Sequence, residues 1–409
     1  MILSKLTITD NELNALAKLK SHFRSIPFYK KYQETDINLI SLENMLNSLP
    51  ILSKNDLIDL KEELYALPFS KISLFSETSG TTGQPLLTPR GQDEIRWNKH
   101  NLTHAFLENL SPETDRVLIL HPSLLSPFVE VCALALKDIG IGYVKAFPIP
   151  KICDYKRISK VITDYKITCI MSTPTLIYKL IYEITKNCNK VIPDSLVKFL
   201  LTGENITESN INNLNKIIDK SGDNVYRFVY GSSESATLMY GTKKNAYRTY
   251  KKDFIFEIVP IAEREENNIN SITGKLLVTW LRDGIAPLIR YDTNDIFTVW
   301  YDKEINDWLF FPKGRMHKSE FTLRDEEIIE DTIYSLNCNV YHFDVFAKNN
   351  NININIITNQ VDTMKYKIFE KLIKKNLEYL KKEIAVIFND KDNSFYHFSP
   401  TPKTLKFKC

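Results

Sequence analysis

The sequence predicts an α/β fold with a large N-terminal α/β domain, made of a parallel sheet and an antiparallel β part, and a small C-terminal α+β domain. Apolar runs of strand length alternate with helical segments between residues 116 and 229. Strand-like segments separated by polar turns follow, and an amphipathic helix stands near the end of the chain. Because the pattern changes again around residues 312–318, we place the two domains at residues 1–313 and 314–409.

Strands and helices alternate through the middle of the chain. In order, and beginning with a strand, the segments are Arg116–Leu120, Phe128–Ile139, Tyr143–Phe147, Tyr155–Tyr165, Thr168–Met171, Pro174–Lys186, Val197–Leu201, Glu208–Lys220 and Val225–Val229. Repeated β-α-β units of this length imply a parallel sheet with helices on its faces. Ligands of such sheets bind beyond the carboxyl ends of the strands, so we expect a site at the turns after Leu201 and Val229.

The second half of the chain predicts antiparallel strands and one long helix. Strands are expected at Phe254–Val259, Lys275–Trp280 and Ile296–Trp300. Asn and Ile alternate within Lys348–Gln360, which has the period of a strand with one buried face, and we expect it at a sheet edge. Met364–Lys382 carries apolar residues at helical spacing. Its lysines form a solvated face, with a docking site for an acidic partner as the alternative.

Composition excludes several classes of protein. The 53 basic and 50 acidic residues nearly balance, which argues against a nucleic-acid binder. Six cysteines form no CxxC pair, so we expect buried thiols rather than a zinc site. The N-terminus has no signal-peptide pattern, and no apolar run approaches a membrane span. The expectation is a cytoplasmic protein that binds no membrane.

The segment Glu77–Pro85 (ETSGTTGQP) packs hydroxyls and glycines into one loop. Glycines let the backbone approach an anion closely, and successive N–H groups form a phosphate-binding nest. The alternative is an ordinary flexible turn. The segment lacks the GxxxxGK[ST] pattern of the Walker loop.

The segment Tyr230–Glu234 (YGSSE) directly follows a predicted strand. An aromatic ring at a strand end offers a face for a base, and Gly231 permits close approach. Glu234 is a hard oxygen ligand of the kind that holds Mg²⁺ against substrate phosphates. The alternative is a strand-end turn with a surface glutamate.

Four further segments stand at predicted turns, at the domain boundary or in the C-terminal tail: Thr202–Glu204 (TGE), Pro287–Asp295 (PLIRYDTND), Gly314–Lys318 (GRMHK) and Thr401–Lys408 (TPKTLKFK). Asp295 is the informative residue here, because a carboxylate accepts two hydrogen bonds and so matches a ribose diol. A turn aspartate is the alternative. A tail lysine is usually solvated.

Taken in order, these six segments resemble the adenylate-forming (ANL) superfamily of acyl-CoA synthetases, luciferases and peptide-synthetase adenylation domains. The subgroup that the chain resembles most is that of phenylacetate–CoA ligase-like enzymes. The succession of FYKKY, SLENMLNSLPILSKNDL and SETSGTTGQP follows the N-terminal order of that subgroup. The likeness extends over nearly the whole chain.

The resemblance implies an ATP-dependent carboxylate ligase. Such an enzyme converts a small carboxylic acid and ATP, with Mg²⁺, to acyl-AMP and pyrophosphate, and passes the acyl group to the thiol of CoA or of an acyl-carrier protein. An aryl or arylacetic acid is favoured, and an amino acid is the alternative. Amide formation, or a degenerate nucleotide-binding protein without activity, are the other functions left open.

The resemblance also implies site residues. The β- and γ-phosphates would meet Ser79, Gly80, Thr81, Thr82 and Gly83, while the adenine would lie between Tyr230 and the pair Gly203 and Glu204, next to Gly231, Ser232 and Ser233. Thr82 and Glu234 would lie near Mg²⁺ and the α-phosphate. Asp295 would bind the ribose with Arg315 nearby, and Asn294 stands where the family has a glycine, a change that a positive φ tolerates.

The remaining implied roles concern the acid and the C-terminal domain. An acyl pocket would include His121, Pro122, Phe128 and Gly231, with a structural role for His121 as the alternative. Lys406 would contact both the substrate carboxylate and the α-phosphate as a catalytic lysine, with Lys403 and Lys408 as rivals. Lys318 would be the hinge about which a mobile C-terminal domain turns.

Overall fold

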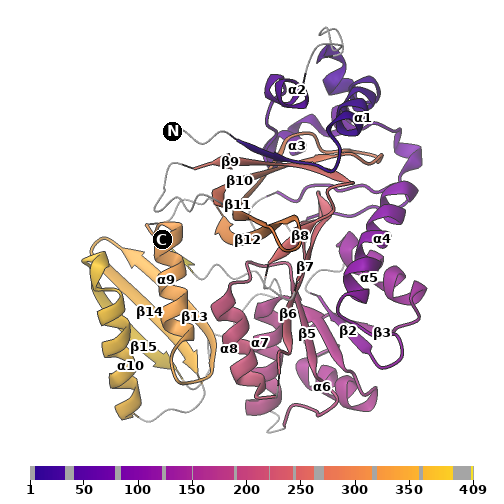
Figure 1. Ribbon diagram of the computed structural model, residues 1–409. Helices are drawn as coiled ribbons and strands as arrows, with labels where there is room; N and C mark the ends of the chain where they lie inside the picture. The colour runs from indigo at the N-terminus through magenta and orange to yellow at the C-terminus, as the bar shows by residue number, and fades with distance from the viewer. Residues whose placement is uncertain are drawn as a thin grey trace. The chain divides into compact units, whose positions relative to one another are not determined.

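The computed structural model describes most of the chain: residues 5–32, 41–78, 84–121, 126–149, 151–187, 191–220, 222–242, 246–261, 271–315, 320–358, 363–389 and 407–408 (Figure 1). The chain forms two compact units. The first contains residues 1–112, 125–141 and 228–316, and the second contains residues 113–124, 142–227 and 317–409. The second unit thus joins the C-terminal part to earlier strands and helices, and a domain boundary after residue 313 stays a prediction.

The first unit is built on antiparallel strands. In spatial order they are β1 (Leu6–Ile8), β9 (Phe254–Pro260), β10 (Ser271–Trp280), β11 (Tyr291–Asp302), β12 (Asp307–Arg315), β8 (Tyr247–Thr249), β7 (Ala236–Gly241) and β6 (Val225–Ser232). The antiparallel pairing confirms the sequence prediction for this half of the chain. The strand begun at Val225 enters the first unit at Phe228, so β6 carries the YGSSE segment into this unit.

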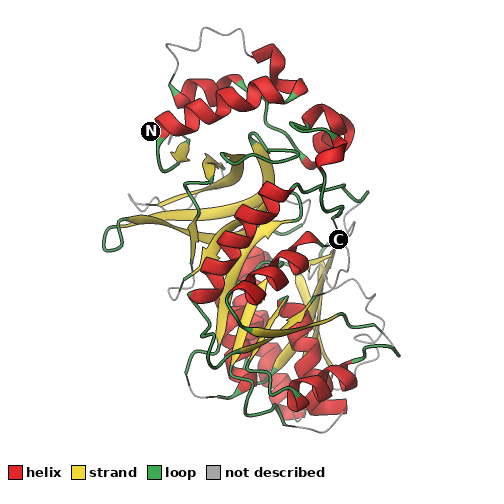
Figure 2. Ribbon diagram, turned by 90° about the vertical axis from the view of Figure 1, so that its right-hand side faces the viewer, coloured by secondary structure: helices red, strands yellow, loops and turns green. Residues whose placement is uncertain are grey.

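Helices of the first unit come mainly from the N-terminal part of the chain, for which the sequence analysis assigned no element. They are α1 (Glu12–Ser25), η1 (Pro27–Tyr32), α2 (Leu42–Ser48), α3 (Lys54–Leu60), η3 (Lys61–Leu64), η4 (Phe69–Lys71), α4 (Gln92–Leu107) and α5 (Pro127–Asp138). Side chains of Asn11, Ser41 and Ser53 cap α1, α2 and α3. Residues of α1, η1, α2, α3, η3 and α4 share one apolar core with β9 and β10 at one end of the sheet (Figure 2).

The second unit contains four parallel strands in the order β5 (Lys198–Thr202), β4 (Cys169–Ser172), β2 (Arg116–Leu120) and β3 (Gly142–Ala146). Its helices here are α6 (Tyr155–Asp164), α7 (Pro174–Tyr182), continued by a π-helical turn at Glu183–Asn187, and α8 (Glu208–Ile218). The β-α-β alternation predicted from the sequence is confirmed. Strands β2, β4 and β5 are almost entirely buried, as expected where helices cover a parallel sheet, while β3, the last strand in this order, is largely exposed.

A separate four-stranded sheet belongs to the C-terminal part of the second unit. Its order is β15 (Glu383–Asn389), β14 (Asn351–Thr358), β13 (Val340–Lys348) and β16 (Phe407–Lys408), with α9 (Leu323–Tyr334), α10 (Thr363–Asn376) and η6 (Glu378–Leu380). Helices α9 and α10 lie side by side (Figure 1). No helix among the described residues is long and apolar enough to cross a membrane.

Strand β14 corrects one expectation. Its buried face is confirmed, since Ile352, Ile354 and Ile356 are fully buried. The edge position is wrong, because β14 pairs antiparallel with β13 on one side and parallel with β15 on the other. The helix predicted before β15 extends to residue 382 and no strand is expected after it, so the covering partner β15 was missed.

Candidate nucleotide-binding site

Three strands of the first unit bring Tyr230, Asp295 and Arg315 together. The Tyr230 hydroxyl donates to Asp295 Oδ2 at 2.7 Å, and Arg315 Nε donates to Asp295 Oδ1 at 2.7 Å. Asp295 and Arg315 are direct partners in the pairing of β11 with β12, which fixes that contact. Both oxygens of the carboxylate therefore hold a donor, and three residues singled out in the sequence form one cluster.

Electrostatics follow from these contacts. The neighbouring Asp295 carboxylate raises the pKa of the Arg315 guanidinium, which stays charged. Burial, followed by the charge of Asp295, raises the pKa of Tyr230 well above its usual value. The Tyr230 ring also packs edge-on against Phe297, at 4.9 Å between ring centres. The phenol is thus a fixed, neutral donor.

The turn after β6 carries Glu234. The Tyr291 hydroxyl donates to Glu234 Oε1 at 2.8 Å, and burial together with Glu234 raises the pKa of that hydroxyl. Ser232 and Ser235 close the turn reciprocally, because the backbone N–H of each donates to the hydroxyl of the other, at 3.0 and 3.1 Å. The turn is therefore braced from within, and its carboxylate is held by a neutral donor.

Gly231 is required at the end of β6. A Cβ atom at this position would lie 2.0 Å from the carbonyl oxygen of Ala236 on the facing strand. Real Cβ atoms do not approach backbone oxygen so closely, so only glycine lets β6 and β7 pair here. In the PLIRYDTND segment, by contrast, a position that the resemblance gives as glycine is occupied by Asn294. Its φ is 60°, the left-handed conformation expected for the residue that replaces a glycine.

Residues flanking the hydroxyl-and-glycine loop form a short two-stranded pairing. Thr78 N donates to Leu86 O at 2.9 Å, and Thr88 N donates to Ser76 O at 2.7 Å. The Ser76 hydroxyl also bonds the Thr88 carbonyl oxygen. Ser79, Gly80, Thr81, Thr82 and Gly83 lie outside the described residues, so their phosphate-binding role stays a prediction.

A cavity of about 350 Å³ adjoins the turn that carries Glu234. Its wall includes Glu234, residues 84–90 after the loop, and helix α3 with the turn that follows it. The cavity therefore borders both the predicted metal ligand and the end of the hydroxyl-and-glycine loop. Most of its lining is apolar, with Leu57, Leu64 and Leu288 among the buried contributors.

The other predicted site residues fall in different places. Glu204 lies in the second unit, where its Oε2 accepts from the Thr175 hydroxyl at 2.8 Å and from Thr175 N at 3.2 Å, at the N-terminus of α7. The adjacent Gly203 has φ = 82°, which explains a glycine there. His121 follows β2 and donates its backbone N–H to Ala146 O at 3.2 Å.

The stacking role of Gly203 and Glu204, and the acyl-pocket role of His121, stay predictions. Phe128 lies in the first turn of α5, in the first unit. Pro122, Lys318, Lys403 and Lys406 lie outside the described residues. Lys408 lies in the two-residue strand β16.

The Glu234 carboxylate and its surroundings fit a magnesium ion that arrives with a nucleotide. Within the described part of the chain, no three His, Cys, Asp or Glu side chains gather as a metal site. Mg²⁺ keeps several waters and binds through one or two carboxylates plus substrate phosphates. The half-buried Glu234 carboxylate, next to a neutral donor, is suited to that single-ligand role.

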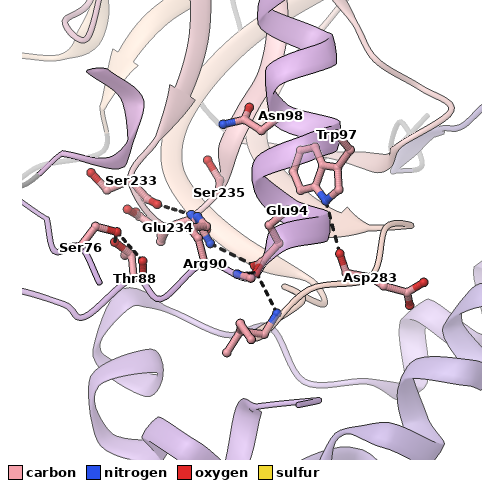
Figure 3. A network of polar contacts seen from close by, with 12 residues as sticks. Ser76, Thr88, Arg90, Glu94, Trp97, Asn98, Ser233, Glu234, Ser235 and Asp283 are labelled. Atoms are coloured by element: carbon pink, nitrogen blue, oxygen red, sulfur yellow. Dashed lines mark hydrogen bonds and ion pairs between the residues drawn. The ribbon is translucent and has the colours of Figure 1, made fainter. Parts of the chain in front are cut away.

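Three residues of this region escaped the sequence analysis. Tyr291 stands inside the PLIRYDTND segment, but only Asp295 was assigned a role there. Arg90 and Glu94 are buried next to the Ser233–Glu234 turn (Figure 3). In the sequence they are an ordinary pair of opposite charges four residues apart, which is common on exposed helices and gives no site signal.

Comparisons with known proteins show the fold. No family model and no curated protein sequence matches the chain. A 2-hydroxyisobutyryl-CoA ligase in the postadenylation state, in complex with R3-HIB-AMP, has a TM-score of 0.78 at 14% identity, covering 96% of this chain and 88% of that one. An open conformation of 2-hydroxyisobutyryl-CoA ligase, with 2-HIB-AMP and CoA, has a TM-score of 0.65 at 15% identity, covering 94% and 89%.

A more distant likeness is to the amide bond synthetase McbA from Marinactinospora thermotolerans. Its TM-score is 0.50 at 13% identity, covering 83% of this chain and 67% of that one. At such identities the likeness extends to the fold. This likeness of fold confirms the predicted fold class.

Proposed function

We propose that this chain, which has the fold of the adenylate-forming ligases, activates a small carboxylic acid with ATP and then transfers its acyl group to a thiol. The observation that carries the proposal is the meeting of Tyr230, Asp295 and Arg315 in the same unit as the Glu234 turn. A stacking ring, a diol acceptor and a metal ligand are the groups that a nucleotide requires.

Binding of ATP would use these side chains as follows. Each Asp295 oxygen already accepts one hydrogen bond and retains acceptor capacity for a ribose hydroxyl. The Tyr230 ring would stack on adenine, and Arg315 adds positive charge beside the ribose. Glu234 would hold Mg²⁺, which neutralises phosphate charge when bound.

In the reaction we propose, a carboxylate oxygen of the acid attacks the α-phosphorus and pyrophosphate leaves. The chain's part is positioning and charge neutralisation, which dominate such transfers. Lys406 is the lysine that we propose contacts both the carboxylate and the α-phosphate. The acyl group then passes from AMP to the thiol of CoA or of a carrier protein.

The acid is proposed to be aryl or arylacetic, in line with the phenylacetate–CoA ligase-like order of the N-terminal segments. Relatives in fold include a ligase crystallised with CoA and an amide bond synthetase, so an amine is the competing acceptor. A cytoplasmic location is supported by the free thiols of Cys153, Cys169 and Cys338, which suit a reducing compartment.

ATP–pyrophosphate exchange across a panel of aryl, arylacetic, amino and short hydroxy acids tests the first step. We expect exchange that depends on one class of acid and that Glu234→Gln abolishes or strongly reduces. ATP binding without exchange for any acid would favour a nucleotide-binding protein that has lost activity. Release of AMP that depends on CoA, or instead on an added amine, then identifies the acceptor.

A further inference from the structure

The turn that carries Glu234 is held by an arginine from a distant part of the chain. Arg90 Nη2 donates to the carbonyl oxygens of Ser233 and of Glu234, the second at 3.0 Å. Arg90 is only 5% exposed, and it precedes helix α4 by two residues. Figure 3 shows the guanidinium between this turn and Glu94.

Glu94 holds the Arg90 guanidinium in place. Its Oε1 lies 3.5 Å from Arg90 Nη1, while its Oε2 accepts from the backbone N–H of Gly91 at 2.5 Å and of Ile285 at 3.0 Å. Glu94 is 1% exposed, so this carboxylate has no freedom to follow a moving partner. Gly284 makes the approach possible, since a Cβ there would lie 2.6 Å from the Glu94 side chain.

The arrangement requires a guanidinium. One side chain meets two carbonyl oxygens and one carboxylate at once, which the planar fork of arginine does and the single ammonium of lysine does not. The guanidinium also lies over the Trp280 ring, at 5.3 Å from its centre. Burial lowers the pKa of Arg90 and raises that of Glu94, while each charge opposes the effect on the other. A buried charge of this kind persists only when its partners are complete.

We propose that Arg90 is a positioning residue for Glu234, anchored by Glu94, and that it sets the affinity of the site for magnesium-bound nucleotide. Arg90 fixes the backbone of the turn, and Tyr291 fixes the carboxylate that the turn presents. The inference rests on the proposed function, in which Glu234 holds Mg²⁺. The alternative is that Arg90 and Glu94 form a purely structural ion pair. Such a pair would stabilise the fold without affecting the Mg²⁺ dependence of nucleotide binding.

The test compares Arg90→Gln and Arg90→Lys with a matched control, Asp253→Asn. Asp253 is also a buried carboxylate, 4% exposed, which accepts from Arg282 at 2.6 Å and from Asn101 of α4 at 2.9 Å. The control therefore disrupts a charge network that contacts α4 through Asn101 and includes neither Arg90 nor Glu234. The melting temperatures of Arg90→Gln and Asp253→Asn are compared. An effect on metal dependence that appears only in Arg90→Gln, at a similar melting temperature, then reflects the lost position of the Glu234 turn and not general destabilisation.

Two readouts are needed, and neither is turnover. Calorimetric titration with ATP at several Mg²⁺ concentrations should show the Mg²⁺-dependent affinity about 10–100-fold weaker in Arg90→Gln, the range typical of lost outer contacts to a metal ligand. Metal-free AMP should bind as in the wild type. Hydrogen exchange of residues 229–238 without ligand should be faster in Arg90→Gln and unchanged in Asp253→Asn. Arg90→Lys, which keeps the charge, should show a partial loss of both.

The outcomes are distinguishable. If the wild type binds Mg²⁺-ATP and Arg90→Gln binds it with the same metal dependence, the positioning role is wrong while the proposed function stands. If the wild type itself binds no Mg²⁺-ATP, the proposed function fails and the positioning role falls with it. If Arg90→Gln does not fold, Arg90→Lys decides by the same two readouts.

Discussion

At the scale of single residues, the site depends on carboxylates whose oxygens are already ordered by the protein. Asp295 holds Tyr230 on one oxygen and Arg315 on the other, and Glu234 holds Tyr291. Ordered acceptors lower the entropy lost when a ligand binds. Tyr230, Asp295 and Glu234 were predicted from the sequence because each matches one group that a bound nucleotide presents, whereas Arg315 was implied by the family resemblance. Tyr291 and Arg90, which support these side chains, were not predicted, because no local sequence pattern marks a residue that acts through another.

Asp295→Asn should weaken nucleotide binding without unfolding the protein. The substitution removes the charge that faces Arg315 and replaces one acceptor oxygen by a donor, and hydrogen bonds to charged groups contribute about 1.5–3 kcal/mol. We expect the Kd for ATP to rise about 10–100-fold in a calorimetric titration. Asp292→Asn, three residues earlier, is the control: its carboxylate lies 3.4 Å from Lys275 and accepts from Asn294 N at 2.8 Å, a bond that an amide oxygen retains, so this variant should bind as the wild type does. Equal affinity of the two variants would remove Asp295 from the site.

Gly231→Ala should destabilise the first unit. The added methyl group would meet the Ala236 carbonyl oxygen at 2.0 Å, so β6 and β7 must separate next to the turn. Overpacking of this kind typically costs about 1–3 kcal/mol of the free energy of unfolding. Gly142→Ala is the matched strand control, because its nearest neighbour would lie at 3.9 Å. Thermal melts of both variants give the comparison, and an unchanged melting temperature for Gly231→Ala contradicts it.

At the scale of elements, the local sequence pattern was sufficient to predict strands and helices where elements that follow one another along the chain also lie side by side. The β-α-β run was predicted because each strand is followed by its covering helix. Strand β14 was placed wrongly because its second partner, β15, arrives only after a helix. Two contacts of the site also join residues that are far apart in the sequence. Tyr230 and Asp295 are 65 residues apart, and Arg90 and Ser233 are 143 apart. Both contacts depend on the completed sheet.

Helix α1 gives a prediction of pH dependence. His22 is 1% exposed, its Nε2 lies 3.1 Å from Trp280 O, and burial lowers its pKa from 6.5 to about 4. The unfolded chain therefore binds a proton between pH 6.5 and 4 that the folded chain does not. The free energy of unfolding should fall with decreasing pH in this window, by up to about 1.4 kcal/mol per pH unit from this residue.

Denaturant titrations across that window check the role of His22. His22→Gln retains a donor for the Trp280 carbonyl oxygen and has no titrating ring, so its free energy of unfolding should depend less on pH between 6.5 and 4. His104→Gln, which removes an imidazole from a half-exposed position on α4, is the matched control. Identical slopes for the wild type and His22→Gln would show that the buried imidazole does not drive the acid sensitivity.

At the scale of the whole molecule, the C-terminal part shares a core with α7 and α8 in the second unit. Tyr178 and Tyr334 stack at 6.1 Å between ring centres, and Asn213 Nδ2 donates to Val340 O at 2.7 Å. Lys216 Nζ donates to the carbonyl oxygens of Tyr334 and Leu336. A C-terminal domain that turns about Lys318, as the sequence resemblance predicts, must release these contacts at some point in the reaction.

Asn213→Ala should loosen this attachment. The substitution leaves the buried Val340 carbonyl oxygen without that donor, which typically costs about 1–3 kcal/mol. We expect faster hydrogen exchange in β13 and earlier cleavage in limited proteolysis near it. Asn215→Ala is the control on the same helix, because its side-chain oxygen accepts from Asn224 N, outside the C-terminal part. Equal protection of β13 in the two variants would mean that Asn213 does not hold the C-terminal part.

Transfer of ¹⁸O from the acid to AMP reports on whether the protein activates a carboxylate with ATP. A pool of carboxylic acids labelled with ¹⁸O in the carboxyl group is incubated with the protein, ATP, Mg²⁺ and hydroxylamine, which traps acyl-AMP as a hydroxamate. Attack by the carboxylate places one labelled oxygen between acyl carbon and phosphorus, and trapping cleaves the acyl–oxygen bond. Mass spectrometry should therefore find AMP carrying one ¹⁸O. AMP without label, or no AMP from any acid, would contradict the account.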